Sequence, residues 1–239
     1  MLRYALVPMV SLPEGAIDTA SSFLNQKEML RLETLAAPSR REQFVAGRWL
    51  VRQLLCEMFG GKPASWNLHI ASSGAPEISP FLGVYPSISH SGQWIAAAIS
   101  DAPVGIDIEQ VYPKRDVDAI AGIVCSPSEI EGLKQIGQEQ KLREFTTKWT
   151  LKEAWLKRDG CGLDFAQMRS LVARSAGIDE ANACSWQAEG EVAVAIVSKH
   201  IFSLAASALS TLPQLPTYWA LDSLKQVLDG PETPSKPAC

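Results

Sequence analysis

Two carboxylates with a single residue between them, Asp107 and Glu109, are the clearest candidates for chemistry in this sequence. In the segment Gly105-Ile106-Asp107-Ile108-Glu109, the alternation of a β-strand places both acids on one face and both isoleucines on the other. Their Cα atoms would lie roughly 7 Å apart, and the charges would repel by about 2 kcal/mol at an effective dielectric constant near 20. The pair is therefore either an exposed, harmless edge or a partly buried pair that needs a cation. The flanking apolar residues favour the second interpretation.

A third carboxylate comes from a later segment with helical spacing. Glu153 lies four residues after Trp149 and three before Leu156, on the apolar face of the helix expected over residues 139–158. It could simply form a surface ion pair with Lys157, one turn further along. Together with the two strand acids, and without a Cys or His cluster, it completes a set of hard oxygen ligands that suits Mg²⁺. Because Mg²⁺ is commonly shared with substrate phosphates, this set predicts a phosphate-bearing substrate.

Basic side chains that could hold such a phosphate occur on an earlier helix. Arg41, Arg48 and Arg52 are seven and four residues apart, which at about 100° per residue places them within about 40° of arc. This stripe is either a solvated helix face or an anion site. His90, just before a turn, is either a structural histidine or a contact to a phosphate or a proton.

Other common functional signatures are missing from the sequence. No G-x-S-x-G nucleophile elbow surrounds Ser89 or Ser91, and there is no Walker A loop or dinucleotide-binding fingerprint. The 22 Lys and Arg residues against 26 Asp and Glu give a net charge of -4, which argues against a general nucleic-acid or anionic-membrane binder. We therefore expect no nucleic-acid partner and no membrane partner.

The composition is that of an ordinary globular chain, with 239 residues of which 46% are hydrophobic and 20% charged. This length fits one large domain or two small half-domains. The five cysteines show no CxxC or Cys/His spacing, and their odd number suits a reducing compartment. The apolar start lacks the features of a signal peptide, and no later segment is long enough to span a membrane. We expect a cytoplasmic protein.

The elements that must position these residues follow from periodicity and from turn signals. A helix should begin after Pro38 and end at Gly60-Gly61, and the capping box of Ser126 and Glu129 should begin another. Short helices are expected over residues 13–35, ahead of the long helix over 139–158. Strands are expected over residues 1–10, 66–71, 87–90, 94–100 and 104–109, and a further β region over 191–206.

Three segments together resemble the motifs of the 4'-phosphopantetheinyl transferases. They are Ile88-Ser89-His90-Ser91, then Gly105-Ile106-Asp107-Ile108-Glu109, then Trp149-Thr150-Leu151-Lys152-Glu153-Ala154-Trp155-Leu156-Lys157, in that family's order and spacing. The length and the separate first block resemble the monomeric, Sfp-type class. The resemblance implies an α+β fold of two similar halves, each with an antiparallel sheet and a long helix, over residues 1–103 and 104–229. The Pro-rich composition of residues 230–239 predicts a disordered tail.

The resemblance also implies a reaction, because the family transfers the phosphopantetheine arm of coenzyme A to a serine hydroxyl of a carrier protein. Asp107, Glu109 and Glu153 would hold Mg²⁺ against the coenzyme A diphosphate. Lys152 and Lys157 would lie near the phosphates. The proton of the attacking serine would go to Glu153 or to a metal-bound water, so that Glu153 and Lys157 are the implied catalytic residues. Adenosine 3',5'-bisphosphate would be released.

The remaining coenzyme A contacts implied by the resemblance lie in the first half of the chain. Ser89 and His90 would contact the adenosine-bisphosphate portion, and Arg41 with Arg48 would match the family's basic residues for the 3'-phosphate. Many relatives carry a Gly-Lys-Pro whose lysine meets a phosphate, whereas this chain has Gly74-Ala75-Pro76. That contact is therefore lost or supplied by one of the arginines.

The implied acceptor is an acidic apo acyl or peptidyl carrier protein. Lys114, Arg115 and the apolar loop over residues 120–125 are the expected docking residues, from charge complementarity and position. The sequence does not distinguish carriers of fatty-acid, polyketide and peptide synthesis. Two other interpretations remain, a catalytically idle module that binds coenzyme A or a carrier protein, and a nucleic-acid binder that uses the arginine helix, which the net charge disfavours.

Overall fold

The computed structural model describes residues 1–11, 18–71, 76–78, 83–112, 114–189, 191–210 and 216–223. The predicted tail at 230–239 and the predicted departure at Gly74 and Ala75 lie outside the described residues. Within the described part, no helix has both the length and the apolar character needed to cross a bilayer. The four described cysteines are all free thiols, as their spacing predicted.

The first half of the chain forms a four-stranded sheet and a long helix. β1 pairs antiparallel with β5, and β5 pairs antiparallel with β4 through the hairpin at Gly92. The strands, in their order in the sheet, are β10 (Leu204–Ala206), β1 (Leu2–Pro8), β5 (Trp94–Ser100) and β4 (Tyr85–Ser91). The other elements of this half are α1 (Gln26–Glu33), α2 (Pro38–Phe59) and the hairpin of β2 (Leu68–Ile70) and β3 (Pro76–Ile78).

The second half forms a five-stranded antiparallel sheet and its own long helix. Its strands, in their order in the sheet, are β6 (Val104–Gln110), β9 (Val192–Ser198), β8 (Ala183–Ala188), β11 (Thr217–Ser223) and β7 (Leu171–Ser175). Its helices are α3 (Val117–Val124), α4 (Pro127–Lys134), α5 (Gln138–Arg158) and α6 (Phe165–Ser170). Short 3-10 helices lie at Met9–Ser11, Ala20–Ser22, Pro63–Ser65 and Ile201–Ser203.

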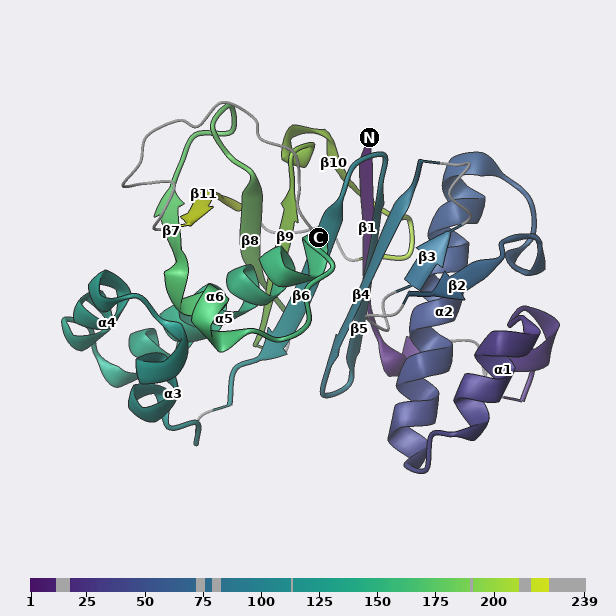
Figure 1. The fold of residues 1–239 in the computed structure, drawn as a ribbon, viewed down its shortest axis with the longest axis horizontal. Helices are drawn as coiled ribbons and strands as arrows, with labels where there is room; N and C mark the ends of the chain where they lie inside the picture. The colour runs from purple at the N-terminus through teal and green to yellow at the C-terminus, as the bar shows by residue number, and fades with distance from the viewer. Residues whose placement is uncertain are drawn as a thin grey trace.

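The two sheets meet in the middle of the molecule, with α2 on one side and α5 on the other (Figure 1). Alternate residues of β1 and β6, such as Tyr4 and Ile106, pack between the sheets, and Ala5 of β1 packs in one core cluster with Leu50 of α2. Burying a side chain such as Ile106, which is 0% exposed, contributes about 1.5–3 kcal/mol. The α+β class, with an antiparallel sheet and a long helix in each of two parts, is confirmed.

The structure differs from the sequence predictions in three places. The apolar segment expected as a loop over 120–125 belongs largely to α3, whose N-cap Asp116 accepts a hydrogen bond from the backbone of Ala119. Strand β10, from late in the chain, joins the first sheet beside β1, so residues 104–229 do not form a self-contained half. The strands β3, β7, β8 and β11 and the short α6 were not anticipated, because their apolar residues are too few or too interrupted to give a clear period.

Candidate active site

A close contact between β6 and α5 brings the strand acids to the helix acid. A Cβ atom added at Gly105 would overlap the backbone carbonyl oxygen of Ala154, so only glycine lets the helix lie directly on this strand. Glu153, the neighbour of Ala154, is held in this way close to the face of β6 that carries Asp107 and Glu109. The apolar stripe of α5 fixes the rotation of the helix, since Phe145 and Leu156 are buried beneath it as expected.

The three carboxylates lie close enough together to affect one another's pKa values. Burial, and then the charge of Asp107, raise the pKa of Glu153 to about 7, with Glu109 adding to the effect and Lys157 opposing it. Burial and the charge of Asp107 also raise the pKa of Glu109. Asp107 itself is 2% exposed. The predicted acids are therefore partly buried and repel one another, which excludes the harmless exposed edge.

The two oxygens of Asp107 have different surroundings. Oδ1 accepts a hydrogen bond from Lys157 Nζ at 2.6 Å and another from Ser89 Oγ at 2.7 Å. Oδ2 is buried and has no hydrogen-bond partner. A buried carboxylate oxygen without a hydrogen-bond partner costs folding free energy, so Oδ2 is suited to bind a cation. Glu109 accepts from Ser91 Oγ at 3.1 Å and lies 3.5 Å from Arg115.

The chemistry of this set fits a divalent cation, although the side chains as placed do not form a closed site. No group of three His, Cys, Asp or Glu side chains in the described part of the chain lies in metal-binding geometry. The fit rests on the unpartnered Asp107 Oδ2 and on the mutual repulsion of three hard oxygen donors. Asp107, Glu109 and Glu153 are the residues that would hold Mg²⁺.

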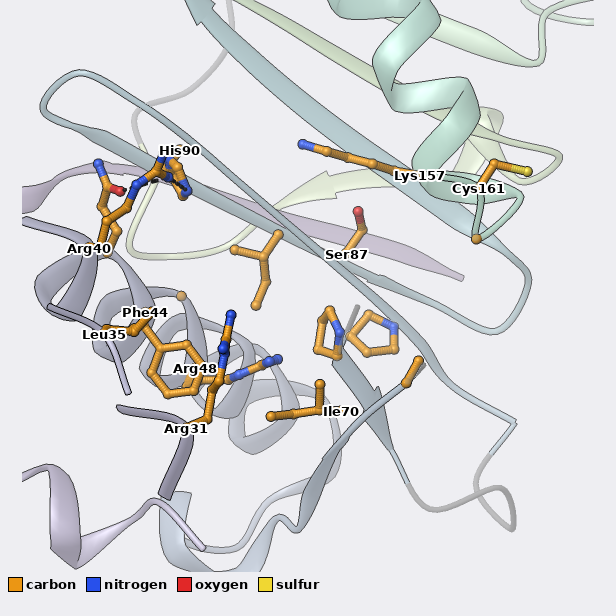
Figure 2. Close-up of a pocket in the computed structure, with 17 residues that line it drawn as sticks. Arg31, Leu35, Arg40, Phe44, Arg48, Ile70, Ser87, His90, Lys157 and Cys161 are labelled. Atoms are coloured by element: carbon orange, nitrogen blue, oxygen red, sulfur yellow. Dashed lines mark hydrogen bonds between the residues drawn. The ribbon is translucent and has the colours of Figure 1, made fainter. Parts of the chain in front are cut away.

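A cavity of about 670 Å³ opens between the two halves beside these acids. Figure 2 shows Arg48, Arg31 and Phe44 on one side and Lys157 and Cys161, at the end of α5, on the other. Ser87, Ile88 and His90 of β4 also line it. The three acids do not themselves line the cavity, but Lys157 lines it and contacts Asp107, so this lysine connects the cavity to the carboxylates.

Arg48 supplies an unused hydrogen-bond donor to this cavity. It is 4% exposed, and its Nη1 has no partner. Burial lowers the pKa of Arg48 to about 10, an effect that Glu28 opposes and Arg52 reinforces. Glu28 is already paired with Arg52 at 2.6 Å, so it does not fully compensate the second guanidinium. The unpartnered donor of Arg48 is therefore suited to an anion, and its contact to a phosphate stays a prediction.

The other arginines of α2 differ from the prediction. Arg41 does not line the cavity and donates through Nη1 to the carbonyl of Leu32, so the cavity gives no support to the predicted phosphate contact of Arg41. Arg40 lines the cavity instead, and its Nη1 lies 3.3 Å from His90 Nε2. Arg52 is fully buried in its ion pair and is structural. The predicted stripe is not a solvated face.

His90, which was predicted to contact the adenosine-bisphosphate portion of coenzyme A, lines the cavity. Burial lowers its pKa, and the positive charges of Arg40 and Lys157 lower it further. The imidazole is therefore neutral at pH 7, with a nitrogen that can accept from Arg40. An anion bound between these groups would favour the protonated ring and thereby gain a further donor.

Lys152 and Ser89 do not have the roles that were predicted. Lys152 is 0% exposed, and its Nζ donates to Glu129 Oε2 at 2.6 Å and to the carbonyl of Val124 at 2.9 Å. It cannot reach a phosphate in the cavity, because its five-residue separation from Lys157 turns it by about 140° around the helix. Ser89 is not among the residues that line the cavity, and its hydroxyl binds Asp107.

Sequence reasoning missed Arg40, Arg31 and Phe44. Arg40 lies about 80° from Arg48 around α2, farther than Arg41 does, so helix phase favoured the wrong arginine. In the structure Arg40 lines the cavity beside His90 of β4. Arg31 comes from α1, whose packing against α2 was not predicted. The helical spacing of four between Phe44 and Arg48 was a usable signal, and the two side chains stack at 5.1 Å.

A cationic cavity next to buried carboxylates, at the junction of two α+β parts, has the charge to suit a phosphate-bearing ligand. Comparison with known families agrees. The model of the 4'-phosphopantetheinyl transferase superfamily matches residues 103–197, and that of the 4'-phosphopantetheinyl transferase N-terminal domain matches residues 28–100. The two matches together cover more than half of the chain. The chain belongs to the 4'-phosphopantetheinyl transferase superfamily.

Individual relatives carry the same description. The chain is 30% identical over 155 residues to the 4'-phosphopantetheinyl transferase HetI of Nostoc sp., covering 63% of this chain and 65% of the relative. It is 27% identical over 152 residues to Sfp of Bacillus subtilis, covering 59% and 67%. It is 33% identical over 122 residues to AcpT of Escherichia coli, covering 51% and 59%. The matched region thus spans about three fifths to two thirds of the length of these relatives.

Proposed function

We propose that this protein transfers the 4'-phosphopantetheine arm of coenzyme A to a serine hydroxyl of an apo acyl or peptidyl carrier protein, releasing adenosine 3',5'-bisphosphate. The observation that carries the proposal is the cavity lined by Arg48, His90 and Lys157, because Lys157 links it to Asp107. Coenzyme A has an anion at each end of its nucleotide part, the 3'-phosphate and the diphosphate. The family and the named relatives support the same reaction.

The residues of the chain divide the work of binding and proton transfer. Arg48 and Arg40 would hold the 3'-phosphate, with His90 as a further donor once an anion raises its pKa. Lys157 would exchange its bond to Asp107 for a phosphate oxygen. Phosphoryl transfer depends above all on alignment of the reacting groups and on stabilisation of charge. A covalent intermediate with the enzyme is therefore not required.

Mg²⁺ held by Asp107, Glu109 and Glu153 would offset the charge that develops on the phosphates. Glu153 would also be one candidate to accept the proton of the attacking serine. The other acceptor open to the reaction is a water molecule. Either acceptor requires the carrier serine to enter the cavity beside the carboxylates.

The carrier protein would dock beside the start of α3. Lys114 is exposed, and within the predicted docking segment Gly122 and Ile123 are exposed while Val124 and Cys125 are buried. Arg115 lies over the ring of Tyr112 and beside Glu109. Reversing the charges of Lys114 and Arg115 should raise the KM for an acidic carrier and leave coenzyme A affinity unchanged. Unchanged carrier kinetics would remove this docking site.

Mass spectrometry of the acceptor tests the proposed activity directly. The protein is incubated with coenzyme A, Mg²⁺ and a panel of apo carriers from fatty-acid, polyketide and peptide synthesis. We expect at least one carrier to gain the mass of one phosphopantetheine arm, with no gain for the same carrier lacking its serine. Coenzyme A binding without transfer to any carrier would favour a catalytically idle binding module. The monomeric state and the cytoplasmic location stay predictions.

A further inference from the structure

Three alternating serines of β4 join the two sheets of the molecule. Strands β4 and β6 belong to different sheets, yet they lie side by side. The hydroxyl oxygens of the serines accept hydrogen bonds from three alternating backbone N–H groups of β6. The bonds are Ile106 N to Ser87 Oγ at 3.1 Å, Ile108 N to Ser89 Oγ at 3.3 Å, and Gln110 N to Ser91 Oγ at 3.1 Å. The hydroxyls thus take the place of the carbonyl oxygens of a neighbouring strand.

Two of the three hydroxyls also donate a hydrogen bond to an acid. Ser89 Oγ donates to Asp107 Oδ1 at 2.7 Å, and Ser91 Oγ donates to Glu109 Oε2 at 3.1 Å. A hydroxyl has one proton to give and lone pairs to accept with, so each serine can do both at once. The β6 backbone fixes the hydroxyl oxygen, and the hydroxyl proton then fixes the carboxylate. Ser87 makes the same bond to the backbone but has no carboxylate on its side of β6.

The pairing decides which oxygen of Asp107 is left for a ligand. Oδ1 is occupied by Ser89 and Lys157, and Oδ2 is left without a partner. If the carboxylate could rotate, Oδ1 and Oδ2 would exchange places, and the unpartnered oxygen would not have a fixed direction. The short bond to a charged acceptor is of the stronger class of hydrogen bonds.

We propose that Ser89 and Ser91 are positioning residues, which orient Asp107 and Glu109 for a divalent cation through hydroxyls anchored on the backbone of β6. The inference rests on the proposed function, since it assigns these acids to a metal. It replaces the sequence-based expectation that Ser89 contacts coenzyme A. Partners of ligating groups typically change metal affinity by about 10- to 100-fold when they are removed.

Ser87 provides a matched control for the alternative that the serines only hold the sheets together. Ser87→Ala, Ser89→Ala and Ser91→Ala each remove one hydroxyl from the same strand and leave one N–H of β6 without its acceptor. Each variant should therefore lose the stability of one contact between the sheets in urea unfolding, and Ser89→Ala and Ser91→Ala should also lose that of the bond to the acid. Only Ser89→Ala and Ser91→Ala remove a bond to a carboxylate.

Mn²⁺ binding, followed by electron paramagnetic resonance in the absence of coenzyme A, distinguishes the two roles without measuring activity. We expect Ser89→Ala and Ser91→Ala to raise the Kd for Mn²⁺ by about 10-fold or more. Ser87→Ala should change this Kd by less than about 2-fold. Equal weakening in all three variants, or none in Ser89→Ala and Ser91→Ala, would overturn the proposal. If Ser89→Ala fails to fold, Mn²⁺ binding by Ser91→Ala, which changes a less buried serine, tests the proposal.

The test of the positioning role can be distinguished from the test of the proposed transferase activity. A wild-type protein that binds Mn²⁺ with the expected serine dependence, but modifies no carrier, would keep the positioning role and refute the transferase activity. A wild-type protein that modifies a carrier, but shows no serine-dependent Mn²⁺ binding, would refute the positioning role alone. Excess Mg²⁺ should restore turnover in Ser89→Ala, which a loss of sheet contact would not allow.

Discussion

Gly105 and Ala154 lie in direct backbone contact, because a Cβ atom at position 105 would occupy the space of the Ala154 carbonyl oxygen. This contact sets the distance between β6 and α5. Two long elements that approach so closely leave no room for side chains between them, and the neighbours on either side are brought together. For Asp107 and Glu153, the result is mutual repulsion in a partly buried site. The site thus depends on a residue that takes no part in the chemistry.

Gly105→Ala should therefore damage both stability and function. We expect the free energy of unfolding to fall by about 3 kcal/mol, because the methyl group meets backbone rather than a flexible side chain. Mg²⁺-dependent turnover should fall by at least tenfold as α5 moves away from β6. Urea unfolding and carrier modification measure the two effects. Gly132→Ala, in an exposed part of α4 with nothing within 4 Å of the new methyl, should instead stabilise by about 0.5–1 kcal/mol.

Adjacent arginines at the start of α2 should have opposite importance for ligand binding. Arg40→Ala removes a cavity donor next to His90, whereas Arg41→Ala removes a bond to the carbonyl of Leu32 outside the cavity. We expect Arg40→Ala to raise the Kd for coenzyme A by about 10-fold, as for one charged hydrogen bond of about 1.5 kcal/mol. Arg41→Ala should change it by less than about 2-fold.

Isothermal titration with coenzyme A and with 3'-dephospho-coenzyme A locates this effect. If Arg40 holds the 3'-phosphate, its loss should matter much less for the dephosphorylated ligand. An equal loss of affinity for both ligands would place Arg40 elsewhere along the bound molecule. A stronger effect from Arg41→Ala than from Arg40→Ala would contradict the cavity as the ligand site.

The sequence was sufficient to predict the residues whose positions follow from local periodicity. Alternation along β6 correctly placed Asp107 and Glu109 on one face, and the apolar spacing over residues 139–158 correctly predicted the helix that carries Glu153. The capping box at Ser126 and Glu129 correctly marked the start of α4. In each case one element determines the answer, so no knowledge of its neighbours is required.

The errors arise where two elements have to be placed relative to each other. Helix phase could not show that Arg40 would meet His90, because that contact depends on how α2 lies on β4. Lys152 resembled a phosphate contact because it is charged and belongs to a recognised motif. Its real partner, Glu129, lies on α4, 23 residues earlier, and the pair became visible only in the packed structure.

The pKa of Glu153 gives the protein a specific dependence of stability on pH. Its usual pKa of 4.5 is raised to about 7 in the folded state, so folding favours the protonated carboxyl. This contribution to stability is fully present below pH 4.5 and is lost as the pH rises towards 7 and beyond. Without Mg²⁺, Glu153→Gln should therefore be more stable than the wild type at pH 8, by about 1 kcal/mol or more, or roughly 2–4 °C in Tm.

Thermal unfolding in EDTA from pH 5 to pH 8 checks this sign. The difference in Tm between Glu153→Gln and the wild type should grow with pH and be smallest at pH 5. Adding Mg²⁺ at pH 8 should stabilise the wild type more than the variant, since a bound cation relieves the repulsion. A difference in Tm that shrinks with pH would show that Glu153 is stabilised as the carboxylate.

Lys152 should be essential for folding and unimportant for ligand binding. Lys152→Met leaves the buried Glu129 without its cation, which should cost about 3–5 kcal/mol, measured by urea unfolding. The double change Lys152→Met and Glu129→Gln removes both charges and should recover much of that loss. Lys134→Met, which breaks an exposed pair with Glu131, should cost at most about 1 kcal/mol.

The recovered double variant separates the structural role of Lys152 from the role that its motif suggested. Because both charges of the pair are buried away from the cavity, the folded double variant should bind coenzyme A with an affinity within about threefold of the wild type, a difference of under about 1 kcal/mol. A direct phosphate contact by Lys152 predicts the reverse, with stability recovered but affinity reduced by tenfold or more. Titration of the double variant with coenzyme A therefore decides whether this lysine belongs to the core or to the site.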